Sequence, residues 1–222
     1  MSVTLINSFA FGTTAPNITY NDTVQSATTS ATSFTNTHNG GVRTGLWIVT
    51  VAYRKASSGT NSDPTSVTLA GTALTKMHGA SLGVNGRQGV SIWISTTNIT
   101  TDGTDDVVVS TSTSNDRCTT SLYKVGNILA PGTTIDRTSD TGAALNLNNN
   151  SATGGVVMVA VGANGDPTAF TWTGLTENSD VNPGGSAFQV SSASAAFSTS
   201  GTKTISATSG ATESIGLIVS VS

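Results

Sequence analysis

The sequence predicts an all-β protein, in the form of a two-sheet, jelly-roll-like β-sandwich with internally duplicated strand sets. Val, Ile and Thr, which favour strands, are abundant along the 222-residue chain. No segment keeps a helical period for more than a turn or two, and the density of Thr and Gly also opposes helix. We expect roughly ten to twelve strands, as in jelly rolls and related folds.

The duplication is indicated by a series of strand patterns that occurs twice in the same order. Apolar runs at 45–51 and 154–161 are each followed by a Thr/Gly segment, a strand, an alternating run and a closing strand. Those segments are 66–77, 90–94, 106–110 and 119–125 in the first copy, and 169–175, 187–190, 203–207 and 214–221 in the second. Such repeats define an architecture. We therefore expect one β-sandwich domain over 21–222, with half-repeats at about 45–127 and 154–222.

The clearest single strand is expected over 45–53. Trp47 begins an apolar series on one face, while Ile48 makes the opposite face apolar too. A strand that is apolar on both faces is typical of the centre of a sheet, where both faces are covered. The polar stretch 22–44 before it predicts one or two exposed edge strands and a loop ending at 39–41.

Two further segments have turn or linker character. The pair Ala70-Gly71, in the middle of 67–77, predicts a tight hairpin turn because glycine tolerates positive φ angles. The stretch 127–153 is expected to connect the two halves and to contain one short strand at 145–147.

The first 20 residues are predicted to form either a terminal strand of the sandwich or an arm that docks on a partner. Leu5, Ile6, Phe9 and Phe11 make this stretch rich in large apolar groups, and they are our interface candidates. The stretch has no basic region followed by an apolar run of signal-peptide length. No segment of the chain approaches the apolar length of a membrane span, so we expect no membrane association.

The composition indicates a surface solvated by hydroxyls and amides rather than by ions. Charged residues make up 9% of the chain and apolar residues 36%, with a net charge of −3 and a sequence pI of about 5.1. No basic run interleaved with aromatic residues is present, which argues against nucleic-acid binding. The single cysteine, Cys118, excludes an intrachain disulfide, and it is expected to be a small buried apolar residue.

A search for catalytic and metal-binding patterns finds none. His38 and His78 are far apart and lack the spacing of a zinc site, although a serine close to either one stays open. The acidic stretch 102–106 is oxygen-rich enough for calcium, but it does not match an EF-hand loop, and Asp and Gly also simply form turns. Glu177 and Glu213 are the only glutamates. We expect no enzymatic activity, no metal and no cofactor.

A carbohydrate contact is a further hypothesis, centred on Trp93. This residue lies opposite Ile92 and Ile94 in a predicted strand, so its ring faces outward if those two are buried. An exposed aromatic ring can stack on a sugar. In the alternative, which we favour, both faces of the strand are covered by the other sheet or by a neighbouring subunit.

The order of these motifs resembles a recurrent β-sandwich module of phage virions and bacterial surface proteins. The resemblance is carried by 45–51, 66–77, 90–94 and 106–110, followed by a second half like the first, and it covers roughly residues 24–222. These motifs mark strands and one hairpin rather than a site. No functional residue is therefore carried over from the resemblance.

The resemblance implies a bacteriophage virion structural protein, most simply a capsid decoration or cement protein that binds the outer capsid surface. Its partners would be the major capsid protein or other virion proteins, and a homo-oligomer, with a trimer favoured, would add avidity. It would be made in the host cytoplasm and work in the virion. The alternatives are a carbohydrate-binding tail or fibre module and a bacterial surface adhesin, and the missing signal peptide argues against the adhesin.

Overall fold

The fold is taken from a computed structural model, which describes residues 17–26, 29–55, 63–82, 87–126, 137–151, 154–165, 168–183, 188–199 and 201–221. Over these residues the chain forms eighteen strands and no helix. The all-β prediction is confirmed. No helix with the length and apolar content of a membrane span occurs in this described part of the chain.

The strands divide between the two halves of the chain. The first half contains β1 (Asn17–Gln25), β2 (Ala31–Arg54), β3 (Pro64–Leu69), β4 (Thr72–Ala73), β5 (Thr75–Ser81), β6 (Gln88–Ile94), β7 (Ile99–Asn115) and β8 (Arg117–Gly126). The second half contains β9 (Arg137–Gly142), β10 (Ala144–Asn146), β11 (Asn149–Ser151), β12 (Gly154–Gly165), β13 (Thr171–Thr173), β14 (Thr176–Val181), β15 (Phe188–Phe197), β16 (Gly201–Lys203), β17 (Ser206–Thr208) and β18 (Ala211–Val221).

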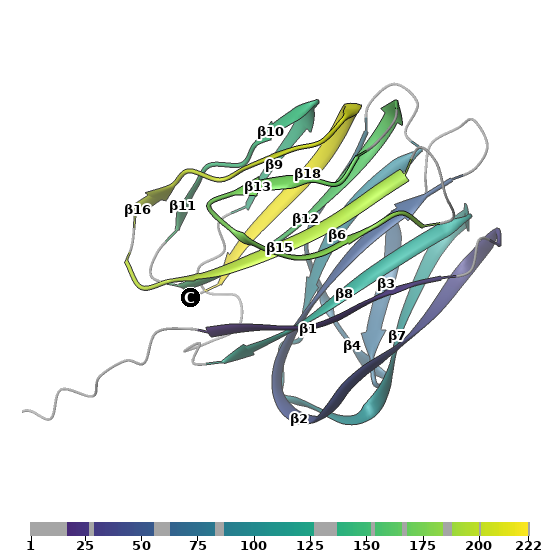
Figure 1. The fold of residues 1–222 in the computed structure, drawn as a ribbon. Coiled ribbons are helices and arrows are strands. Elements are labelled where there is room, and N and C mark those ends of the chain that lie inside the picture. Colours follow the sequence, from purple (N-terminus) through teal and green to yellow (C-terminus); the bar gives the residue numbers. More distant parts are fainter. Residues whose placement is uncertain are drawn as a thin grey trace, which may run out of the picture.

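The strands form four layers (Figure 1). The first outer layer contains the 31–45 part of β2 with β7, β3 and β4, and the first inner layer contains β5, β6, the 46–54 part of β2, β8 and β1. The second inner layer has the order β14-β15-β12-β18-β9. The second outer layer contains β10, β17 and β13 together with the pair β11 and β16. The fold is therefore two β-sandwiches stacked through their inner layers.

The strand order shows the duplication directly. The first inner layer runs β5-β6-β2-β8-β1 and the second runs β14-β15-β12-β18-β9, all antiparallel. The outer layers match as well, because β2-β7-β3 corresponds to β10-β17-β13. The equivalent strands extend over 17–126 and 137–221, so each repeat begins well before the apolar run that marks it in the sequence.

Three apolar cores separate the layers. On one face of β2, Trp47, Val49 and Val51 belong to the core of the first sandwich. On the opposite face, Ile48 and Ala52 belong to the core between the inner layers. The 46–54 part of β2 lies between β6 and β8 and is covered on both faces, which confirms the central strand. The core of the second sandwich is smaller; its fully buried members are Leu145, Leu147, Ala160, Phe170, Ile205, Ala207 and Ile218.

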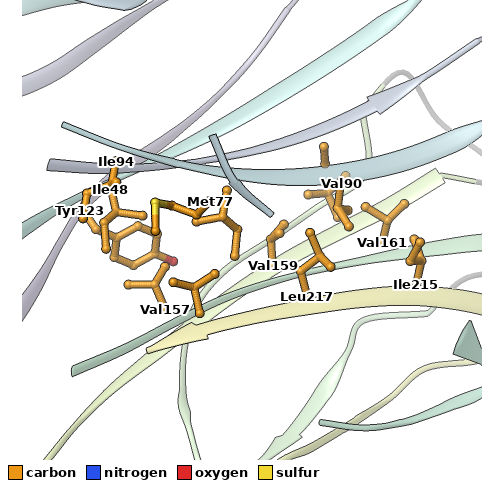
Figure 2. Packing of buried hydrophobic residues seen from close by; sticks show 14 of the residues in the cluster. Ile48, Met77, Val90, Ile94, Tyr123, Val157, Val159, Val161, Ile215 and Leu217 are labelled. Atoms are coloured by element: carbon orange, nitrogen blue, oxygen red, sulfur yellow. The ribbon is translucent and has the colours of Figure 1, made fainter. Parts of the chain in front are cut away.

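The core between the inner layers joins the two halves (Figure 2). At one end Ile48, Ile94 and Tyr123 face Val157, and at the other end Val90 lies close to Val161 and Ile215. The Tyr123 hydroxyl donates a hydrogen bond to Asn178 Oδ1 on β14 at 3.2 Å. Apolar burial of this kind is the main favourable term in folding. The two sandwiches are thus held together by a continuous core rather than by a polar contact surface.

The loop predicted at 39–41 is instead an irregularity within β2. The pairing of β2 with β7 shifts between His38 and Gly41, and Gly41 has φ of 75° while its partner Gly103 has φ of 107°. Glycines adopt these angles without the steric conflict of a Cβ atom. The strand can therefore bend here and stay paired with β7 as far as Gly45, and it enters the inner layer from Leu46.

The hairpin turn predicted at Ala70-Gly71 is confirmed. It joins β3 to β4, with Leu69 paired to Thr72. Both turn residues have positive φ, 49° for Ala70 and 76° for Gly71. This is the signature of a type I′ turn, whose twist suits a two-residue hairpin.

Candidate functional sites

The structure buries Trp93, the residue predicted to contact glycans. Only 4% of its surface is exposed, and it packs in the core of the first sandwich. Its indole Nε1 donates to Ser91 Oγ at 2.9 Å, and the Lys76 ammonium lies 5.9 Å from the ring centroid. Trp93 therefore has no ring face available for a sugar. The alternative, in which both faces of the strand are covered, holds, and the covering layer belongs to the same chain.

The other predicted site residues lie outside the described part of the chain. These are the interface candidates Leu5, Ile6, Phe9 and Phe11. The described chain begins at Asn17 with β1, which pairs with β8 at the edge of the first inner layer. Residues 17–20, predicted as part of a strand or of an arm, are thus in a strand.

The strongest chemical constellation joins Asp22 on β1, His38 on β2 and Thr120 on β8. His38 Nδ1 pairs with Asp22 Oδ1, and His38 Nε2 lies 2.9 Å from Thr120 Oγ1. Asn36 Nδ2 donates to the same Thr120 oxygen at 2.9 Å. In the neutral tautomer that carries its proton on Nδ1, His38 donates to Asp22 and its Nε2 accepts from the Thr120 hydroxyl. This is the donor order of an acid–histidine–hydroxyl triad.

Burial keeps the hydroxyl of this group away from solvent. The exposed fraction is 0% for Thr120 and 1% each for His38 and Asn36. Burial by itself would raise the pKa of Asp22, but hydrogen bonds from His38, from the Asn39 backbone N–H at 3.0 Å and from Asn21 hold it below its ordinary value. A nucleophile must reach its substrate. In this arrangement the group ties three strands together instead.

The second half builds the equivalent position from apolar residues. Thr120 corresponds to Gly216 in the matched registers of β8 and β18. A Cβ atom at Gly216 would lie 2.8 Å from Cδ1 of both Leu145 and Leu147, so these leucines occupy the space above it. The fold therefore does not require a polar group there, and Asn36 Oδ1 is left without a hydrogen bond. A buried polar network of this kind helps to specify one arrangement of strands.

The acidic stretch predicted as a calcium site or a turn makes internal hydrogen bonds. Asp105 Oδ2 accepts from the backbone N–H groups of Asp102 and Gly103 at 3.0 and 3.3 Å, and Asp102 Oδ1 accepts from Thr104 N at 3.0 Å. Asp106 Oδ1 accepts from Thr37 Oγ1 at 2.6 Å. The predicted turn is wrong, because the stretch lies within β7, where the pairing with β2 is irregular at Gly103 and these bonds hold the backbone. In the described residues, no three His, Cys, Asp or Glu side chains gather where they could hold a metal ion.

Cys118 is buried in the first sandwich core with 1% of its surface exposed. Burial raises the pKa of its thiol well above the ordinary value. The reactive form of cysteine is the thiolate. Cys118 is therefore an apolar core residue in the folded protein, as the sequence predicted.

Both outer layers present hydroxyl and amide groups to solvent. On the first, the paired residues Ser33, Ser110 and Ser66 form one row across β2, β7 and β3. On the second, the row across β10, β17 and β13 is Asn146, Ser206 and Thr173. Inward-pointing apolar residues alternate with these side chains. The result is two outer faces, on opposite sides of the stack, that carry rows of hydroxyl and amide groups.

A shallow pocket of about 270 Å³ lies where β2 leaves β8 to join the outer layer. Thr44, Asn98 and Lys124 contribute polar groups, and Leu46 and Val125 contribute apolar surface. Thr44 is also hydrogen-bonded to Thr100 through their hydroxyls at 2.8 Å. The pocket could take a small polar ligand with one apolar face.

No family model, curated protein or solved structure matches this chain. The interpretation of the sites therefore depends on their geometry. Sequence reasoning considered a serine near His38 but missed Thr120, which is 82 residues away along the chain. The available signal was the period-two series Phe34, Asn36 and His38, in which two polar residues share the inward face with a phenylalanine.

Proposed function

We propose that this chain is a bacteriophage virion structural protein that decorates the outer capsid surface. The supporting observation is how the molecule distributes its apolar surface: the four layers bury it in three internal cores and leave hydroxyl-rich outer faces. The His38 and Thr120 side chains of the triad-like group are buried. A rigid slab of this kind suits adhesion to a preformed surface, and the order of sequence motifs resembles virion modules.

The proposed contacts are the N-terminal segment and one outer face, with the major capsid protein as partner. Low charge suits a contact that persists in varying salt, because ion pairs are screened and apolar burial is not. A homo-oligomer, with a trimer favoured, would multiply these contacts. Nucleic acid and membrane are not part of this proposal.

The test uses empty heads assembled from the major capsid protein encoded nearest to this chain in its genome. Full-length protein is expected to co-sediment with the heads to a saturating ratio, and a variant lacking residues 1–12 is expected to lose most of this binding. Ser66→Lys and Thr171→Lys place one charge on exposed positions of the equivalent outer-layer strands β3 and β13. If an outer face docks, one of this matched pair loses binding and the other does not. Absence of saturable binding by the full-length protein would reject the decoration proposal.

A carbohydrate-binding tail or fibre module is the alternative, and the pocket beside Lys124 is the observation that favours it. Its hydroxyl, amide and ammonium groups are of the kind that bond sugar hydroxyls, and Leu46 offers an apolar surface for a sugar ring. A glycan array would test it. The alternative predicts a hit that Asn98→Ala abolishes and Trp93→Phe leaves unchanged, since Trp93 is buried.

A further inference from the structure

Four of the nine basic residues of the chain gather at one corner of the first inner layer. Arg54 ends β2 and is followed by Lys55, Arg87 directly precedes β6, and Arg117 begins β8. Arg54 and Arg117 are register partners. The Lys55 backbone N–H donates to the Arg87 carbonyl at 2.8 Å, and Arg87 Nε donates to the Lys55 carbonyl at 3.3 Å. All four side chains are half-buried.

The positive charge of this corner is only partly balanced. Arg117 Nη1 lies 2.6 Å from Asp116 Oδ2, and Arg117 Nε donates to the Pro183 carbonyl at 2.8 Å. Asp116 forms its salt bridge with Arg117 in this cluster. The adjoining sequence segments 56–62 and 83–86 contain no Asp or Glu. Arg54 thus has two arginines and one carboxylate, namely Arg117, Arg87 and Asp116, close enough to act on its charge.

Arg54 is the member with a buried guanidinium nitrogen, Nε, that lacks a hydrogen bond in the described structure. Burial lowers the pKa of Arg54, and the charges of Arg117 and Arg87 add to that effect while Asp116 opposes it. Asp116 Oδ1 is also buried without a hydrogen bond. A buried donor without a partner is costly, particularly on a charged group.

The second half shows that the fold does not require this cluster. The register pair equivalent to Arg54 and Arg117 is Ala163 and Glu213, on β12 and β18. The position of Gln88 beside Arg54 is taken by Phe188 beside Ala163. The same corner is therefore built once with two guanidinium groups and once with none. The arginines are therefore not needed to form this corner of the fold, and the reason for them must lie in the first half alone.

We propose that this corner is an oxyanion-binding site, in which the Arg54 guanidinium, with Arg117 and Arg87 beside it, binds a carboxylate or phosphate group. A guanidinium group binds a carboxylate or a phosphate by paired N–H···O hydrogen bonds, and partial burial strengthens the attraction between the charges. An anion here would give the Arg54 donors their acceptors and would offset the repulsion among the three arginines. The inference stands whether or not the chain decorates a capsid.

The test follows the arginine Nε–Hε signals of the full-length, ¹⁵N-labelled protein during titration with sodium phosphate and, separately, sodium acetate, at constant ionic strength set with sodium chloride. We expect the Arg54 signal to shift saturably with at least one of the two anions. A response to phosphate alone indicates a phosphate or sulfate ligand, and a response to acetate indicates a carboxylate. Arg54→Gln should weaken the affinity about tenfold or more. Arg54→Lys keeps the charge without the paired donors and should fall between wild type and Arg54→Gln.

Arg43→Gln is the matched control, because it makes the same substitution at an exposed position of the same strand. It should leave the affinity unchanged. The proposal is overturned if neither anion shifts the Arg54 signal saturably, or if chloride alone has the same effect. It is also overturned if Arg43→Gln weakens binding as much as Arg54→Gln. The wild-type titration decides the question even if the Arg54 variants do not fold.

Discussion

At the scale of single residues, the buried hydroxyl of Thr120 connects three strands. It accepts from Asn36 and bonds His38, and His38 in turn bonds Asp22 on the edge strand β1. The energetic importance of such a hydroxyl comes less from the bonds it makes than from the buried groups that would be left unpaired without it.

We therefore predict that Thr120→Val, which keeps the shape and removes the hydroxyl, lowers the free energy of unfolding by about 1–3 kcal/mol. Chemical denaturation followed by tryptophan fluorescence would measure this. Thr100→Val is the control, because Thr100 makes its hydroxyl bond to Thr44 at an exposed site and should change stability by less than about 0.5 kcal/mol. If the two substitutions lower the free energy of unfolding equally, the buried network stabilises the protein no more than the exposed hydroxyl pair does.

Asp22 gives this network a dependence on pH. Its pKa in the folded protein lies below the ordinary value of 3.8, so around that value the folded state binds fewer protons than the unfolded state. The stability from ionised Asp22 is therefore fully present above about pH 4 and is lost as the pH falls through the folded-state pKa. We predict that Asp22→Asn is less stable than wild type at pH 7 and that the gap narrows below pH 3.8.

Urea denaturation of both proteins between pH 2 and 7 would check this dependence. The same comparison in a His38→Gln background is the control, since it removes one of the hydrogen bonds that lower the pKa of Asp22. The pH-dependent part of the gap should shrink there. A gap that stays constant across the whole range would contradict the prediction.

At the scale of elements, the β3–β4 hairpin has a turn residue that is not the best available. Ala70 has φ of 49° and is exposed, a conformation in which Asn is favoured over Ala. We predict that Ala70→Asn stabilises the protein by about 0.5 kcal/mol. Gly71→Ala should destabilise it by about 1 kcal/mol, although a Cβ atom at Gly71 would meet nothing within 4 Å. Thermal unfolding would show the two shifts, and a loss of stability in Ala70→Asn would contradict the turn assignment.

The same scale shows what the sequence could and could not predict. The 46–54 part of β2 was predicted because apolar residues on both faces, such as Trp47 and Ile48, leave no other stable environment for a strand. The 31–45 part was predicted as separate edge strands with a loop, because its outward residues are polar and Gly40-Gly41 looks like a chain turn. Only the pairing of Gly41 with Gly103 across two strands shows that the chain bends there instead of ending.

The candidate sites were less predictable than the strands. Asp22, His38 and Thr120 come from three strands, and only the register of β1 and β2 on β8 brings them together. Trp93 was correctly placed opposite Ile92 and Ile94. Alternation along one strand could not tell whether another layer covers the tryptophan, because that depends on how many sheets stack.

At the scale of the whole molecule, the number of layers is the main departure from the sequence prediction. The β-sandwich was predicted, but the chain forms two sandwiches stacked through a shared core. Short strands such as β10, β13 and β17, each of three residues, make up the second outer layer. Segments this short carry almost no periodic signal. They form because the apolar residues they contribute, Leu145 and Ala207 among them, cover the far face of the second inner layer.

The shared core predicts that the two halves unfold together. Leu217→Ala removes a fully buried side chain from that core and should cost about 2–5 kcal/mol. Trp47 and Trp93 belong to the first sandwich and Trp172 to the second, so single-tryptophan variants report on each half. We expect both reporters to shift to the same lower denaturant midpoint. Val67→Ala, which changes the first sandwich core, is the control for a local change. If Leu217→Ala shifts only the denaturant midpoint reported by Trp172, the two halves unfold independently.

Joining the two halves in one polypeptide also removes a constraint that a symmetric dimer would face. In a dimer of identical subunits every substitution occurs twice, and dilution separates the partners. Here the association is intramolecular at any concentration, and the two faces have diverged: Thr50 and Ser121 on one inner layer stand where Val159 and Leu217 stand on the other. One half can thus keep apolar residues at a position while the other half acquires a polar or charged group there. The corner with Arg54, Arg87 and Arg117 is an example.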